Sequence, residues 1–156
     1  MKKILSAIGI FLVAALVAII TFLISGEKGK QLPTKALLIG DKTFNVEIAD
    51  TIASRTRGLS GRGFLSEDDG MFFIFPYSAI QHFWMKGMKF PIDIIWISGD
   101  KVIGMVMGAE PEAGPDYEIY SSPEIADKVL EINAGLTQKF GIKTGDSIGI
   151  SLGQLE

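Results

Sequence analysis

The chain has 156 residues, no cysteine, one histidine and a formal net charge of −3. Without cysteine it can form neither a disulfide framework nor a thiolate metal site, and it has no thiol nucleophile. Lys2 and Lys3 precede the predicted domain. Without these two positive charges, the formal net charge falls from −3 to about −5. An acidic domain is a poor partner for phosphate backbones, so we expect no nucleic-acid partner.

An unbroken apolar run from Ile4 to Ile24 follows the first three residues. At about 1.5 Å per residue, a helix of this length matches the hydrocarbon core of a bilayer. A signal peptidase cut after Gly26 would place bulky Ile24 at position −3, where small residues are preferred. We therefore expect residues 1–25 to form one uncleaved transmembrane anchor, with a cleaved signal sequence as the alternative.

The lysines before this run favour a cytoplasmic N-terminus. The predicted location is therefore the cell membrane, which the chain would cross once through Ile4–Ile24, with the domain on the extracytoplasmic side. Residues 26–34 are rich in Gly, Lys and Gln and predict a linker. Residues 35–156 are long enough for a single compact β domain, which we expect to be monomeric.

Short β-type runs dominate this domain. Two pairs of runs alternate around Gly40-Asp41 and Gly99-Asp100, which predicts two hairpins. Met71–Phe75 is continuously apolar and predicts a strand buried on both faces. The remaining predicted strands are Lys35–Ile39, Thr43–Ala49, Ile94–Ser98, Lys101–Met107, Val129–Ile132 and Ser147–Leu152.

Two short helices are also predicted. The first starts after an N-cap at Asp50 or Thr51, ends at Gly58, and places Ile52, Thr56 and Leu59 on one stripe. The second runs from Ala134 to Phe140. All six prolines are expected at element edges. The fold class is therefore mostly β (α+β), a curved antiparallel sheet or partial barrel with one or two short helices, preceded by one transmembrane helix.

Five blocks of sequence, in this order, resemble the domain of unknown function 192 family. They are Arg57–Arg62, Asp69–Pro76, Phe83–Asp93, Val129–Gly135 and Gly145-Asp146. The resemblance covers about residues 35–151 and implies a compact, mostly β domain without assigning an activity. One departure is Gly87, where the family more often has Asn.

Four charged residues in these blocks interrupt otherwise apolar sequence: Arg57, Lys86, Asp93 and Glu131. Charges in apolar β-structure usually have a partner or a functional role. One interpretation is a ligand-binding pocket in which Arg57 and Lys86 receive an anionic or hydroxyl-rich group, oriented by Asp93 and Glu131. Trp84 would join them, because strand alternation places it on the same side as Lys86. The other interpretation is a buried structural ion-pair network.

Catalytic and metal-binding patterns are weak. A Ser60–His82–Asp93 triad is formally available, but Arg62 replaces the second glycine of a nucleophile elbow. Calcium could use loop carboxylates, but these lack the spacing of a calcium loop; the residues concerned are Glu67, Asp68, Asp69, Glu110, Glu112, Asp116 and Glu118. We therefore expect no metal and no cofactor.

Three classes of function remain. The first is a membrane-anchored extracytoplasmic module that binds a small molecule, an envelope polymer or a protein in a charged, aromatic pocket. The second is an envelope-acting hydrolase, which would need Asp93 and Glu131 to converge at a separation of about 5–10 Å. The third is a purely structural or assembly factor without a pocket.

Overall fold

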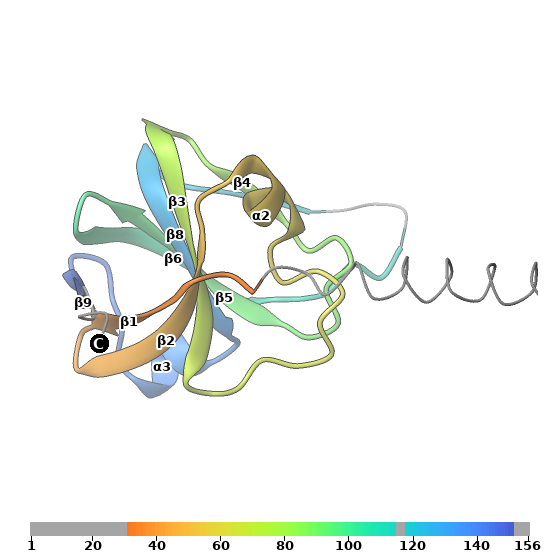
Figure 1. The fold of residues 1–156 in the computed structure, drawn as a ribbon, viewed down its shortest axis with the longest axis horizontal. Coiled ribbons are helices and arrows are strands. Elements are labelled where there is room, and N and C mark those ends of the chain that lie inside the picture. Colours follow the sequence, from red (N-terminus) through yellow and green to blue (C-terminus); the bar gives the residue numbers. More distant parts are fainter. Residues whose placement is uncertain (1–30, 115–117, 152–156) are drawn as a thin grey trace, which may run out of the picture. The chain divides into compact units, whose positions relative to one another are not determined.

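The computed structural model describes residues 31–114 and 118–151 (Figure 1). The chain divides into two compact units, Met1–Gln31 and Leu32–Glu156, and the second contains the helices and strands described below. Among the described residues, no helix is both long and apolar enough to cross a bilayer. The anchor predicted for residues 1–25 lies outside them.

Seven strands form one curved, half-barrel sheet, in the order β6-β5-β8-β3-β2-β1-β9 (Figure 1). Two short strands, β4 and β7, form a separate antiparallel ribbon. The strands are β1 Thr34–Ile39, β2 Lys42–Ala49, β3 Asp69–Ala79, β4 His82–Trp84, β5 Ile92–Ser98, β6 Lys101–Ala109, β7 Ile119–Ser121, β8 Ala126–Asn133 and β9 Ile148–Ser151. The helices are α2 Ile52–Arg57 and α3 Leu136–Lys139. The mostly β, curved-sheet prediction is confirmed.

The sheet is mixed rather than wholly antiparallel, because β2 and β3 run parallel, with Val46 opposite Gly70 and Ala49 opposite Phe73. The segment between these strands contains α2 and a long loop. Such a connection returns the chain to the end of the sheet from which β2 started, and parallel pairing requires that return. The prediction of a wholly antiparallel sheet was wrong at this pair.

Within the described residues, the two edge strands β6 and β9 meet at one end of the sheet. Lys101 at the start of β6 forms a bridge with Ser147, just before β9. The Val102 amide donates to the Asp146 carbonyl at 2.9 Å, and the Gly145 amide donates to the Val102 carbonyl at 2.8 Å. The barrel is therefore partial, as predicted.

Both faces of β5, of Gly70–Phe73 in β3 and of Val129–Ile132 in β8 are buried. One core packs between the sheet and α3 and includes Phe44, Phe72, Ile95, Leu130 and Leu136. The other lies on the opposite face, and its members include Leu59, Met71, Phe73, Met85, Ile94, Trp96 and Val129. This double burial explains why the central parts of these strands are apolar on both faces, with Asp93 and Glu131 as exceptions.

The helices differ in detail from the prediction. The Thr51 side chain caps α2 by accepting from the Ser54 amide, and Gly58 ends the helix with a φ of 51°, as expected. The predicted apolar stripe was wrong, because Ile52 is 79% exposed while Leu59, beyond the helix end, is buried. Pro76 lies inside β3 rather than at its edge, in the stretch where the pairing with β8 becomes irregular, so the ladder tolerates its missing amide.

We predict that Gly70→Ala lowers the free energy of unfolding by about 1–3 kcal/mol, because a side chain there overpacks the sheet. A Cβ atom at Gly70 would lie 2.9 Å from the Glu131 carbonyl oxygen and 3.2 Å from the Ile132 side chain. Urea unfolding followed by circular dichroism measures the loss. Gly63→Ala is the matched control, since a Cβ there meets nothing within 4 Å. Equal stability of the two variants would contradict the prediction.

Candidate functional site

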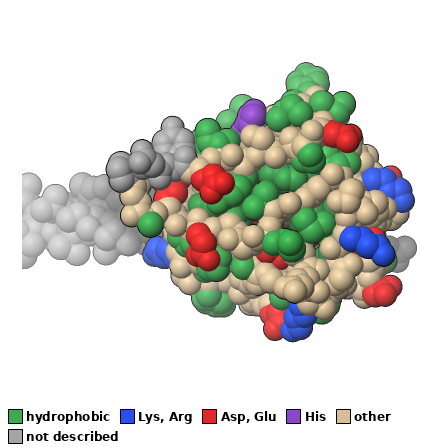
Figure 2. Space-filling model, turned by 180° about the vertical axis from the view of Figure 1, so that it is seen from behind, with side chains coloured by type: hydrophobic (Ala, Val, Ile, Leu, Met, Phe, Trp, Pro, Cys, Tyr) green, Lys and Arg blue, Asp and Glu red, His purple; other side chains and the backbone are tan. Residues whose placement is uncertain are grey.

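A cavity of about 200 Å³ lies between α2 and β4, and we call it the α2–β4 cleft. Three of the five residues predicted for the site line it: Arg57, Trp84 and Glu131. The full lining comprises Arg55, Thr56, Arg57, Gly58, Leu59 and Ser60, then Phe73 and Phe75 from β3, His82, Phe83 and Trp84 from β4, Met88, and Glu131 from β8. Figure 2 shows hydrophobic side chains gathered near the chain's single histidine.

Glu131 is the buried polar group of this cleft. It lies on β8 between Met71 of β3 and Ile94 of β5, its neighbours in the strand register. The residue is 5% exposed, and its Oε2 has no hydrogen-bond partner among the described residues. Burial disfavours the charged form and raises the pKa of Glu131 from 4.5 to about 8, although attraction to Arg62 acts in the opposite direction. The carboxyl is therefore mainly protonated at neutral pH.

The ion pair between Arg62 and Glu47 does not neutralise Glu131. Glu47 on β2 lies opposite Met71, in the same cross-strand row as Glu131. Arg62 binds both oxygens of Glu47, at 2.5 and 2.8 Å, and this hydrogen bonding raises the pKa of Arg62. Because its guanidinium is engaged by Glu47, Arg62 acts on Glu131 only through a weaker, longer-range attraction.

Cationic and aromatic groups form the walls and rim. Arg55 donates from Nη1 to the Ile74 carbonyl at 2.8 Å, and its guanidinium lies 5.3 Å from the centre of the Phe75 ring. Arg57, at the end of α2, is exposed, and the ion pairs of the described part of the chain do not include it. Phe83 packs edge-on against Phe73, with ring centres 5.0 Å apart. Trp84 is 49% exposed at the rim.

Hydrogen bonds join two of the family-like blocks beside the cleft. The Gly61 amide donates to the Gly87 carbonyl at 2.8 Å, and the Ser60 hydroxyl donates to the Lys86 carbonyl at 2.7 Å. Gly87 has a φ of 71°, a left-handed conformation that Gly and Asn adopt most readily. The conformation of the turn therefore accounts for Gly here and for Asn in the family.

Asp93 does not line the cleft. Its pairing partner on β8 is Ile132, so its side chain lies on the sheet face opposite to that of Glu131. Its Oδ1 accepts from the amides of Gly108 at 2.8 Å and Gly135 at 3.1 Å. Its Oδ2 accepts from the Thr137 amide and hydroxyl at 2.9 and 2.7 Å. Asp93 therefore holds the chain around α3, and the two carboxylates do not converge in one cleft.

The other predicted constellations are also separated. Lys86 is exposed and its side chain does not line the cleft. The triad is not assembled: Ser60 donates to Lys86, Asp93 accepts from Thr137, and His82 Nδ1 lies 2.8 Å from the Ser121 hydroxyl. The sequence analysis did not single out Arg55, whose position on the cleft wall no motif indicates.

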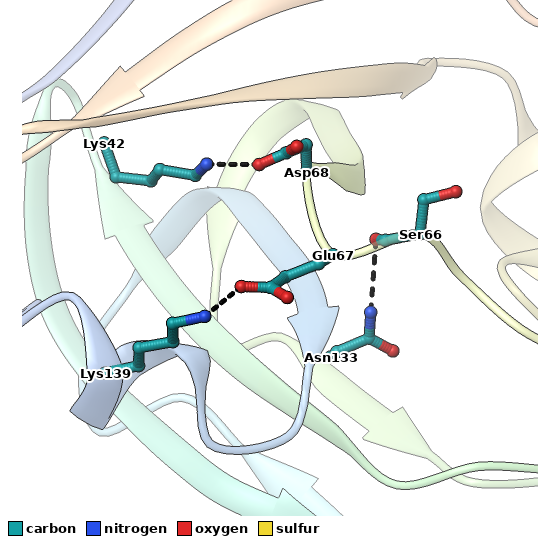
Figure 3. Close-up of polar contacts among 6 residues, drawn as sticks. All are labelled: Lys42, Ser66, Glu67, Asp68, Asn133 and Lys139. Carbon is teal, nitrogen blue, oxygen red and sulfur yellow. Dashed lines mark hydrogen bonds and ion pairs between the residues drawn. The ribbon is translucent and has the colours of Figure 1, made fainter.

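The loop that precedes β3 is tied to the sheet and to α3 (Figure 3). Lys42 pairs with Asp68, and Lys139 pairs with Glu67. The Asn133 side-chain amide donates to the Ser66 carbonyl at 3.2 Å. Two of the carboxylates considered as calcium ligands therefore already have lysine partners, and their contacts fix the loop that carries Arg62.

Comparison with known proteins places the chain in a family. The model of DUF192, described as uncharacterized ACR, matches residues 36–150, and the chain belongs to that family. The fold is similar to that of a protein of unknown function from Novosphingobium aromaticivorans DSM 12444, at 29% identity and a TM-score of 0.72, covering 79% of this chain and 89% of that one.

A second similar structure is a protein from Sinorhizobium meliloti 1021 described as a putative transcription regulator. It is 26% identical with a TM-score of 0.72, covering 78% of this chain and 96% of that one. No curated protein matches the sequence significantly.

We predict that Glu131 makes the domain less stable as the pH rises. Between pH 4.5 and about 8 the native carboxyl retains a proton that the unfolded chain has lost. The Glu131 contribution to the free energy of unfolding therefore decreases across this range, by at most about 1.4 kcal/mol per pH unit. Glu131→Gln removes this loss, so the stability of the variant relative to the wild type should increase with pH.

Urea unfolding at a series of pH values measures this difference. Glu124→Gln is the matched control, because Glu124 is exposed and outside the cleft. If the difference between the Glu131→Gln variant and the wild type is the same at pH 5 and pH 8, Glu131 does not retain its proton.

Proposed function

We propose that the domain is a ligand-binding module and that the α2–β4 cleft is its binding site. The observation that supports this most directly is the unpartnered Oε2 of Glu131 on the cleft wall. A buried polar atom without a hydrogen bond costs roughly 1–3 kcal/mol. A ligand that forms a hydrogen bond with the Glu131 carboxyl group would recover part of this cost.

The composition of the cleft supports binding over the two alternative functions. Apolar and aromatic walls with a few convergent polar groups are typical of small-molecule sites. The hydrolase would need two carboxylates on one face, whereas Asp93 and Glu131 lie on opposite faces of the sheet. A purely structural factor would not need a cavity lined by a buried carboxyl group that lacks a hydrogen-bond partner.

The volume limits the ligand to a small molecule or to one residue of a larger one. About 200 Å³ accommodates a single ring with its substituents, and Trp84 at the rim offers a surface for stacking. The Sinorhizobium protein's description as a regulator does not extend to nucleic-acid binding here, because the acidic net charge disfavours it.

We further propose that residues 1–25 anchor the domain to the cell membrane, with the domain on the extracytoplasmic side. The support is the sequence: the Ile4–Ile24 run is long enough to span a bilayer, and Lys2 and Lys3 precede it.

We predict that Arg57→Ala weakens ligand binding while changing the free energy of unfolding by no more than about 1 kcal/mol, as expected of an exposed charge. Hits from a saturation-transfer NMR screen of single-ring acids, alcohols and amides would be compared between the wild type, Arg57→Ala and Trp84→Ala. Lys89→Ala is the matched control, since Lys89 is exposed and outside the cleft. Hits that persist in both cleft variants would contradict the assignment of the site.

We predict that protease added to intact spheroplasts removes the domain while a cytoplasmic control protein survives. The lysines before the apolar run should keep the N-terminus in the cytoplasm. Protection of the domain would overturn the orientation. A mature protein that begins near Glu27 would show instead that the first segment is a cleaved signal.

A further inference from the structure

We propose that the ligand of the α2–β4 cleft is a small carboxylic acid, bound as its anion, and that Glu131 in its neutral form donates a hydrogen bond from its carboxyl group to the ligand carboxylate. This inference rests on the proposed function and names the ligand class. The geometric basis is a carboxyl group that lies on the cleft wall, is more than nine-tenths buried and lacks a partner at Oε2. A neutral carboxyl has one O–H donor to offer.

The charges around Glu131 favour an anion over a cation. Arg55 and Arg57 face the cleft from α2, and His82 faces it from β4. Along the sheet, Arg62 and Glu47 form a closed pair, so together they add little net charge. The pairing neighbours Met71 on β3 and Ile94 on β5 bring no charge, and Asp93 lies on the other face.

Aromatic walls alone would favour a cationic ligand through cation–π contacts. In this cleft, however, the two arginines would repel a cation. Arg55 already lies over the Phe75 ring, one of the faces that a ligand cation would use. An anion meets favourable potential at the rim and a hydrogen-bond donor inside. A bond between a neutral acid and a carboxylate is charge-assisted and therefore stronger than one between neutral groups.

Binding of a carboxylate should therefore depend on the protonation of Glu131. Once this carboxyl ionises, it loses its donor and places a second negative charge next to the ligand. With the pKa of Glu131 at about 8, we expect binding to weaken about tenfold between pH 6 and pH 9. The weakening should follow Glu131 and no other group.

Three probes that share a phenyl ring test the ligand class: benzoate, the neutral benzamide and the cationic benzylammonium. Each would be titrated into the full-length chain in nonionic detergent at pH 6 and pH 9. Amide and indole NMR signals of Ser60 and Trp84 would report on the cleft. Benzoate should bind most tightly at pH 6 and lose about tenfold by pH 9, whereas benzamide should change much less.

Variants assign the pH dependence. Glu131→Gln should bind benzoate equally at both pH values, because its amide donates at either. Arg57→Ala should weaken benzoate at both pH values by the same factor, and Lys89→Ala should change nothing. Because histidine also titrates near neutral pH, His82→Asn is included, and it should retain the pH dependence. Loss of the dependence in His82→Asn with its persistence in Glu131→Gln would overturn the proposal.

The outcomes separate the ligand class from the proposed function. If benzamide or benzylammonium binds the cleft more tightly than benzoate at pH 6, the cleft is a binding site for another ligand class and the carboxylate proposal is wrong. If none of the three probes shifts the signals of the cleft, the proposed function fails together with the ligand class.

Discussion

Both faces of β5 and of parts of β3 and β8 are buried, and this constraint determines what a charged side chain there can do. Asp93 and Glu131 occupy neighbouring rows on opposite faces. Asp93 receives three hydrogen bonds from the chain around α3 and one from the Gly108 amide of β6, which replace its hydration. The Oε2 atom of Glu131 has no hydrogen-bond partner among the described residues. Burial therefore disfavours the charged carboxylate and raises the pKa of Glu131. Two carboxyl groups in similar sequence thus have different surroundings.

Much of the fold could be predicted from local sequence. Alternation identified β2, a continuous apolar run identified β3, and Thr51 and Gly58 marked the ends of α2. The parallel β2–β3 pair could not be predicted, because parallel and antiparallel strands share the same local pattern and only the path of the connection decides between them. Pro76 was misplaced because an irregular stretch within a strand leaves no mark in the sequence.

The candidate site was predicted in part. Charge within apolar sequence singled out Glu131, which lines the cleft together with the exposed Trp84. The same signal also selected Asp93, whose partners are mainly backbone amides that no sequence pattern displays. Lys86 follows β4 at the start of a turn, where strand alternation no longer sets the direction of a side chain. Arg62 was missed as a structural residue, because its partner Glu47 lies on a distant strand.

The central claim is that Glu131 is a neutral acid on the wall of the cleft at physiological pH. The most direct test is to follow the side-chain carboxyl ¹³C shift of Glu131 by NMR across pH 3–10, using Glu131→Gln to assign the signal. The account predicts a titration midpoint near 8. A midpoint near 4.5, the ordinary value for a solvated glutamate, would show that the carboxyl is charged and hydrated in the native state and would contradict the account.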